Sequence, residues 1–90
     1  MAVVVKFLPR AERDLLSLPD PVQDEVMHKL ELLAEFPRMG PMMEMAYRGC
    51  RFVLAGRNRY RIVYKIASSQ LIEIVSVRHC RRQMGLRVVH

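Results

Sequence analysis

The sequence predicts a small α+β domain with the element order β-α-α-β-β-β, an antiparallel-rich sheet and two helices packed on one face of that sheet. Three observations lead to this fold class. The 90 residues suffice for one domain, residues 1–90, and a hydrophobic content of 51% suits a globular core rather than a disordered chain. Apolar residues at helical spacing lie in the first half of the chain. Strand-like alternation fills the second half.

The first half is expected to contain one strand and both helices. "VVVKF", residues 3–7, is short and β-branched, which is typical of a strand. "PRAERDLLSL", residues 9–18, opens with a proline that suits a first helical turn. "DPVQDEVMHKLELLAEF", residues 20–36, is expected to be the longer helix, with Asp20 as its cap. Its apolar residues form one stripe: Val22, Val26, Leu30 and Leu33.

The second half is expected to contain the remaining strands. "MAYRGCRFVLA", residues 45–55, predicts two strands that are joined near Gly49. "RYRIVYKI", residues 59–66, alternates most clearly, with Tyr60, Ile62, Tyr64 and Ile66 on one face. The other face then carries Arg59, Arg61, Val63 and Lys65. "LIEIVSV", residues 71–77, is apolar on both faces apart from Glu73 and Ser76, so a position in the middle of the sheet is predicted.

The charge of the chain is divided between its two halves. Residues 1–44 contain five Lys or Arg and eight Asp or Glu, a net charge of −3, whereas residues 45–90 contain ten Lys or Arg and one Glu, a net charge of +9. A field of this kind attracts polyanions to one side of a protein. The basic residues that follow the last predicted strand are expected to join Arg61 at the rim of that side: Arg78, His79, Arg81 and Arg82.

Several classes of protein are disfavoured by the sequence. The longest run without a charged residue, residues 66–72, is far too short to span a bilayer, and Lys6 interrupts the apolar start, so a cytoplasmic protein is expected. Cys50 and Cys80 lack the spacing of a metal motif and are expected to be reduced thiols. A zinc site would require both cysteines to converge with His28 and His79, so no metal and no cofactor are expected.

Three motifs in order resemble the RelE/ParE superfamily of bacterial type II toxins: "FLPRAERDLLSLP" near the start, "YRIVYKI" in the third quarter and "VRHCRR" after the last predicted strand. The resemblance covers almost the whole chain. It implies a toxin that a partner antitoxin holds inactive. One branch of such toxins cuts mRNA on the ribosome, whereas the ParE branch poisons DNA gyrase. A toxin fold without activity is a third interpretation.

The resemblance also suggests the site residues. Arg61 corresponds to the arginine that RelE-type toxins use against the scissile phosphate, and Arg81 falls near a second functional arginine. His79 is the candidate acid or base, because imidazole titrates near neutral pH and its cationic neighbours disfavour its charged form. Leu86 stands near the position where RelE-type toxins often have a tyrosine, and "RHCRR" looks more like ParE-like members. Further RNA or phosphate contacts are expected from Arg51, Arg59, Lys65, Arg78 and Arg82.

Each candidate also has an ordinary structural interpretation. Basic residues on a sheet face are often a solvated surface, and His79 could be a rim histidine that is bonded to backbone. Tyr60 and Tyr64 share the face of Ile62 and are therefore expected in the core. Acidic residues of the helices are expected to point outward, which leaves the basic face as the site for polyanions: Asp14, Asp24, Glu31 and Glu35.

Overall fold

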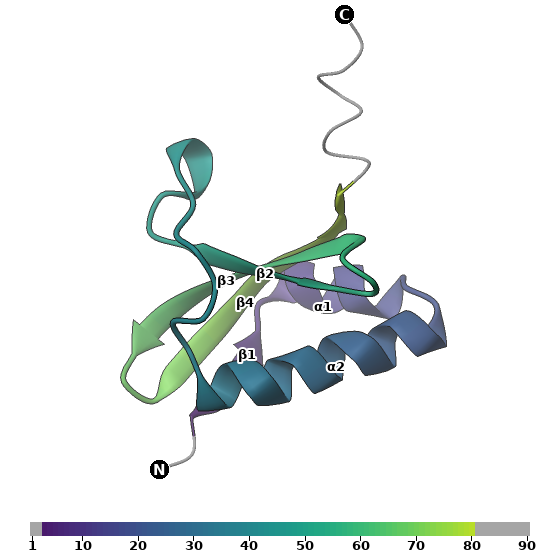
Figure 1. Cartoon of the computed structure of the whole chain (residues 1–90), viewed down its shortest axis with the longest axis horizontal. Coiled ribbons are helices and arrows are strands. Elements are labelled where there is room, and N and C mark those ends of the chain that lie inside the picture. Colours follow the sequence, from purple (N-terminus) through teal and green to yellow (C-terminus); the bar gives the residue numbers. More distant parts are fainter. Residues whose placement is uncertain (1–2, 81–90) are drawn as a thin grey trace, which may run out of the picture.

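The computed structural model describes residues 3–80, which form a four-stranded sheet covered on one side by two α-helices (Figure 1). The strand order is β1-β4-β3-β2, with β1 parallel to β4 and the other neighbours antiparallel. The predicted α+β class is confirmed. The elements are β1 (Val4–Phe7), α1 (Pro9–Leu16), α2 (Asp20–Glu35), the 3-10 helix η1 (Met45–Tyr47), β2 (Arg51–Ala55), β3 (Tyr60–Ser68) and β4 (Leu71–His79).

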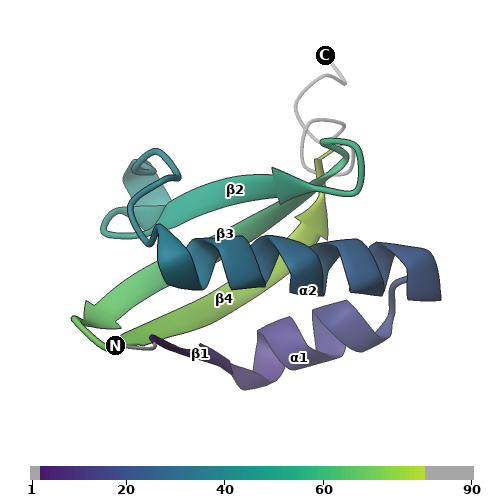
Figure 2. The same cartoon turned by 60° about the horizontal axis from the view of Figure 1, so that its bottom comes forward.

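β4 lies in the interior of the sheet, between β1 and β3, as its apolar sequence predicts. Its residues Ile72 and Ile74 are fully buried. β1 can run parallel to β4 because both helices intervene in the chain, and parallel neighbours need such a long connection. Figure 2 shows α2 lying across the sheet, with α1 beside it near the end of β1.

The helices pack the apolar stripes that the sequence predicts. Val26, Leu30 and Leu33 of α2 belong to the core, and Ala11 of α1 is fully buried there as well. The predicted cap of α2 is wrong: Asp20 is the first helical residue, and the extended Pro19 occupies the cap position. The negative charge of Asp20 in the first turn still stabilises the helix, because it interacts favourably with the helix dipole.

Tyr64 ties the loop after α2 to the sheet. Its side chain is fully buried, and its hydroxyl donates to the carbonyl of Pro37 at 2.6 Å and accepts from the amide of Gly40 at 3.2 Å. Gly40 is closely packed, since a Cβ there would lie 2.2 Å from the carbonyl oxygen of Phe52. Arg51 Nη1 donates to the carbonyl of Gly40 at 2.7 Å. The prediction that Tyr64 is a core residue is confirmed.

The strand predicted in the first part of residues 45–55 is wrong. Met45–Tyr47 forms η1, in which Met45 has a φ of 61°. Gly49 also has a positive φ, 91°, and the amide of Cys50 returns to the carbonyl of Tyr47 at 2.9 Å. Left-handed residues at both ends prevent this segment from extending along β2. η1 lies beyond the start of β2, away from both helices (Figure 1).

The first prediction concerns the hydroxyl of Tyr64. Tyr64→Phe should lower the free energy of unfolding by about 1–3 kcal/mol, because the buried Gly40 amide and Pro37 carbonyl lose their partner. Urea unfolding at pH 7 measures this loss. Tyr47→Phe removes a hydroxyl from a half-buried tyrosine in η1 and serves as the control, for which a much smaller loss is expected.

The same variant should change the stability of the protein at alkaline pH. Burial raises the pKa of Tyr64 above its ordinary value of 10.0, although the bond to Gly40 and the charge of Arg51 act in the opposite direction. As the pH rises, the unfolded chain therefore releases the hydroxyl proton of Tyr64 before the folded protein does. The contribution of this group to the free energy of unfolding is full below pH 10.0 and is lost as the pH rises through the raised pKa. The free energy of unfolding of Tyr64→Phe should therefore fall less steeply with pH in this range than that of the unchanged protein. Equal slopes for the two proteins would contradict this account.

Candidate phosphate-binding face

The register of β3 and β4 decides which side chains share a face. Arg61 pairs with Arg78, and Tyr60 pairs with His79. Paired residues point to the same face of a sheet, and successive residues point to opposite faces. Because Ile62 and Tyr64 belong to the core under the helices, Arg61 and Arg78 lie on the sheet face away from the helices. We call this face the basic face, and these two residues the arginine pair.

β4 extends two residues beyond the predicted strand, and this extension separates His79 from Arg61. The imidazole of His79 lies on the helix side, with its ring centroid 4.9 Å from that of Tyr60 and an interplanar angle of 76°. The expectation that His79 stands beside Arg61 is therefore wrong, because strand alternation continues through Arg78 to the end of β4. A role of His79 in proton transfer stays a prediction.

Phe52 fixes the position of the Arg61 guanidinium. The guanidinium carbon lies 4.7 Å from the centroid of the Phe52 ring, a cation–π contact worth about 0.5–1 kcal/mol at an exposed site. Arg61 is half-buried, and its Nε is buried without a hydrogen-bond partner among the described residues. Arg78, directly across the ladder, is exposed. Like charges in this position destabilise a sheet, so the arginine pair is a candidate for anion binding.

The charge on the basic face is concentrated at one end. In its middle lie Val63 and Ser76, which pair with each other and are both buried. A β-bulge follows, because Tyr64 pairs with Ile74 and Val75 is the additional residue. Lys65 lies four residues along β3 from Arg61, about 13 Å away, and pairs across the ladder with Glu73. Lys65 therefore does not join the arginine pair.

The other predicted phosphate ligands are spread over the structure. Arg51 Nη1 donates to the carbonyls of Gly40 and Arg38, so its guanidinium holds the loop after α2. Arg59 is exposed directly before β3, and its carbonyl accepts the amide of Cys80 at 2.8 Å. Arg81 and Arg82 lie outside the described residues, so their predicted roles stay predictions.

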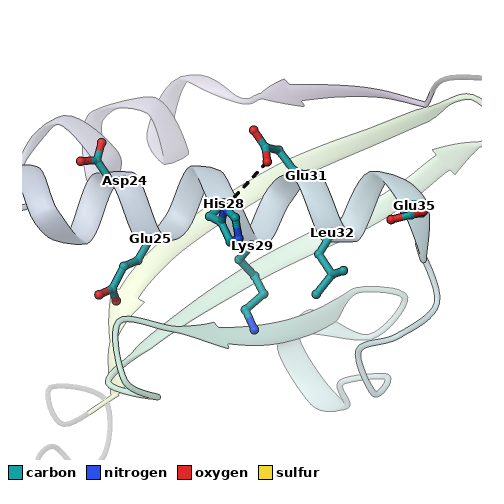
Figure 3. Close-up of a pocket in the computed structure, with 7 residues that line it drawn as sticks. All are labelled: Asp24, Glu25, His28, Lys29, Glu31, Leu32 and Glu35. Atoms are coloured by element: carbon teal, nitrogen blue, oxygen red, sulfur yellow. Dashed lines mark ion pairs between the residues drawn. The ribbon is translucent and has the colours of Figure 1, made fainter.

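An acidic surface covers the outer side of α2. Figure 3 shows its side chains lining a shallow cavity of about 530 Å³. His28 Nδ1 lies 3.8 Å from Glu31 Oε1. The outward positions predicted for Asp24, Glu31 and Glu35 are confirmed, since all three are exposed. A surface of this charge repels polyanions and directs them to the basic face.

Asp14 is the exception among the predicted outward carboxylates. It is half-buried, and its Oδ2 accepts the backbone amide of Val77 at 3.0 Å. Val77 lies beyond the part of β4 that pairs with β1, which ends at Ile74. The carboxylate therefore supplies the acceptor that a neighbouring strand would otherwise provide. The sequence contained no local signal for this contact, because the two residues are 63 positions apart.

Two findings on membranes and metals apply to residues 3–80. Within this range no helix is long and apolar enough to cross a membrane. The same residues contain no group of three His, Cys, Asp or Glu side chains that could hold a metal ion. Cys50 and Cys80 are free thiols.

The chain belongs to the ParE toxin family. A family model described as "ParE toxin of type II toxin-antitoxin system, parDE" matches residues 5–84. The predicted membership of the RelE/ParE superfamily is thereby confirmed, and the protein is a toxin of a type II toxin–antitoxin system. Among curated proteins, none matches the sequence.

Solved structures of related toxins share the fold. The toxin–antitoxin complex RelBE2 of Mycobacterium tuberculosis matches at 26% identity and a TM-score of 0.71, covering 88% of this chain and 99% of that chain. A mutant of E. coli toxin RelE in complex with an antitoxin RelBc peptide matches at 22% identity and a TM-score of 0.78, covering 100% and 97%. The chromosomal ParDE system of P. aeruginosa matches at 13% identity and 0.69, covering 87% and 96%.

The second prediction tests the unequal distribution of charge on the basic face. The affinity of the toxin for a single-stranded RNA oligonucleotide should fall steeply with salt, because bound phosphates release counterions. Arg78→Ala should reduce the slope of log K against log salt by about 0.7, the value for one phosphate contact. Lys65→Ala, which removes the same charge opposite Glu73, should change the slope little. Equal effects of both substitutions would show that phosphates contact the whole face.

Proposed function

We propose that this toxin arrests growth by metal-independent cleavage of mRNA on the ribosome, with Arg61 as a ligand of the scissile phosphate. The observation that supports the proposal is the arginine pair: Arg61 and Arg78 face the same side from adjacent strands, and Phe52 supports the Arg61 guanidinium. Two guanidinium groups can each bind phosphate oxygens in bidentate fashion. Ribosomes and mRNA are the proposed partners, and the cytoplasm is the proposed location.

The proposed reaction is attack of a ribose 2′-hydroxyl on the adjacent phosphorus. The 2′-oxygen forms a bond to phosphorus, the bond to the 5′-oxygen breaks, and one proton moves from the attacking to the leaving oxygen. Negative charge grows on the phosphate oxygens in the transition state, and a positioned cation there is worth about 10²–10³-fold in rate. Arg61 and Arg78 supply this stabilisation. Arg81 is proposed as a further phosphate ligand and His79 as the acid or base, a role that requires RNA to reach the helix side of β4.

We further propose that a cognate antitoxin inhibits the toxin by covering the basic face. The structures of related toxins that carry an antitoxin support such a partner. Acidic side chains on the antitoxin would form ion pairs with Arg61 and Arg78, and would thereby neutralise the charge that a phosphate neutralises when RNA is bound. Expression of the toxin without this partner should arrest growth, and co-expression should restore it.

Inhibition of DNA gyrase is the second candidate function. Two observations favour it: the matching family model is that of ParE toxins, and His79 lies on the opposite face of the sheet from Arg61. A gyrase inhibitor needs no acid or base beside its arginines. The fold is compatible with both candidate functions, so only the cellular target distinguishes them.

The third prediction separates the two functions. Induction of the toxin in a bacterium should produce cleavage at translated codons before the response to DNA damage begins. Arg61→Ala should abolish growth arrest, because loss of the phosphate ligand costs about 2.7–4 kcal/mol in the transition state. Arg57→Ala makes the same substitution at an exposed residue in the turn before β3 and should leave toxicity unchanged.

Thermal melts followed by circular dichroism must accompany these assays, because Arg61 is half-buried against Phe52. A loss of about 0.5–1 kcal/mol is expected for Arg61→Ala, too little to unfold the protein. DNA breaks with intact mRNA in the arrested cells would support gyrase inhibition. A folded Arg61→Ala variant with full toxicity would show that the basic face is not the active one.

A further inference from the structure

Two buried polar atoms on the basic face have no hydrogen-bond partner. Within residues 3–80 they are the only buried nitrogen or oxygen atoms of side chains in this condition: Nε of Arg61 and Oγ of Ser76. Buried polar groups are hydrogen-bonded in the large majority of cases, so each exception requires an explanation. Because both exceptions in this part of the chain belong to the same sheet face, we sought one explanation for the two.

The strand register makes these two residues neighbours. Arg61 pairs with Arg78, and Val63 pairs with Ser76, so Ser76 lies diagonally opposite Arg61 on the basic face. Diagonal neighbours on one face of an antiparallel pair are about 7–8 Å apart, which is within reach of a long side chain. The N–H group of Arg61 Nε is a donor, and the hydroxyl oxygen of Ser76 can accept a hydrogen bond from it.

The guanidinium of Arg61 lies on the β2 side of β3 instead. The Phe52 ring, whose centroid is 4.7 Å from the guanidinium carbon, belongs to β2 and to a residue that pairs with Val63. β2 and β4 flank β3 on opposite sides. Phe52 and Ser76 are therefore alternative contacts of one arginine, on either side of Val63. Repulsion by Arg78 on β4 favours the contact with Phe52 when no anion is bound.

A phosphate shared by the arginine pair would reverse this preference. It neutralises the repulsion between the two guanidinium groups and attracts that of Arg61 toward Arg78, which belongs to β4. Ser76 precedes Arg78 by two residues on the same strand, so the two side chains share a face. A movement of the Arg61 guanidinium toward β4 therefore brings its Nε toward the hydroxyl of Ser76.

We propose that Ser76 is a positioning residue for Arg61, and that its hydroxyl accepts a hydrogen bond from Nε when the arginine pair holds a phosphate. This bond gives both buried atoms a partner and leaves the terminal nitrogens of the guanidinium for the phosphate. Phe52 holds the arginine in the free toxin, and Ser76 holds it in the bound toxin. The phosphate as ligand rests on the proposed function, whereas the hydrogen bond can be measured with inorganic phosphate alone.

The test follows the Nε–H signal of Arg61 by NMR while the isotope-labelled toxin is titrated with inorganic phosphate. Bound phosphate should slow the exchange of this proton with water, because the Nε–H group gains an acceptor. Ser76→Ala should abolish the slower exchange and weaken phosphate binding about tenfold, since a hydrogen bond to a charged group contributes about that factor. Ser69→Ala, at an exposed serine in the turn between β3 and β4, should change neither quantity.

Two further comparisons separate a positioning role from a packing role. Ser76→Ala removes a buried hydroxyl without a partner, so the variant should unfold at an equal or higher urea concentration while it binds phosphate more weakly. Ser76→Thr and Ser76→Val add the same volume, and only the first of them retains a hydroxyl. Ser76→Thr should therefore bind phosphate more tightly than Ser76→Val, whatever the added methyl group costs in packing.

Several outcomes would overturn the proposal. Unchanged phosphate affinity of Ser76→Ala, or equal affinities of Ser76→Thr and Ser76→Val, would show that the hydroxyl does not hold Arg61. Slower Nε–H exchange that persists in Ser76→Ala would assign the acceptor to the phosphate itself. Failure of phosphate to bind the unchanged toxin would remove the arginine pair as an anion site, and this proposal with it.

The proposal and the proposed function can fail separately. Cleavage of mRNA at an unchanged rate by Ser76→Ala would remove the positioning role and leave the proposed function. A phosphate-dependent bond between Arg61 and Ser76, in a toxin that leaves mRNA intact, would do the reverse.

Discussion

The pairing of β3 with β4 is the constraint on which the basic face depends. This ladder places Arg61 and Arg78 together on the basic face, and it places Tyr60 and His79 together on the helix side. A slip of β4 by one residue along β3 would move Arg78 to the face opposite Arg61 and His79 to the face opposite Tyr60. The same slip would move Ile72 and Ile74 out of the core, where both are fully buried. Burial of these side chains therefore stabilises the arrangement of the charges.

The helix layer is connected through Asp14 to the strand that carries Arg78. Its bond to the amide of Val77 fixes the end of α1 against the edge of β4, two residues from His79 and one from Arg78. A movement of α1 would therefore change the end of the strand that carries Arg78. The outer side of α2, in contrast, is rich in exposed acidic residues and repels polyanions. The two helices thus affect the surroundings of the basic face in different ways.

Arginine has two distinct uses in this structure. Arg51 bonds to carbonyls of the loop after α2 and, with Tyr64, holds that loop against the sheet. Arg61 has no hydrogen-bonded carbonyl for its Nε among the described residues and lies against Phe52 instead. A guanidinium that is held by an aromatic ring keeps its edge available for a phosphate, whereas one that is bonded to backbone does not. The number of arginines on a pair of strands therefore does not tell how many of them are available to bind phosphate.

The sequence by itself determined the order of the elements, the apolar stripes of α1 and α2, and the face on which Arg61 lies. These features follow from periodicity, which is a local property of the chain. Its resemblance to RelE and ParE toxins likewise identified the family. Only the tertiary structure decided that β4 continues to His79. The end of β4 is set by the start of β3, because His79 pairs with Tyr60, the first residue of β3. It also decided the roles of Arg51 and Asp14, since each bonds to a segment that is distant in sequence. Left-handed backbone at Met45 and Gly49, which apolar alternation does not reveal, converted a predicted strand into η1.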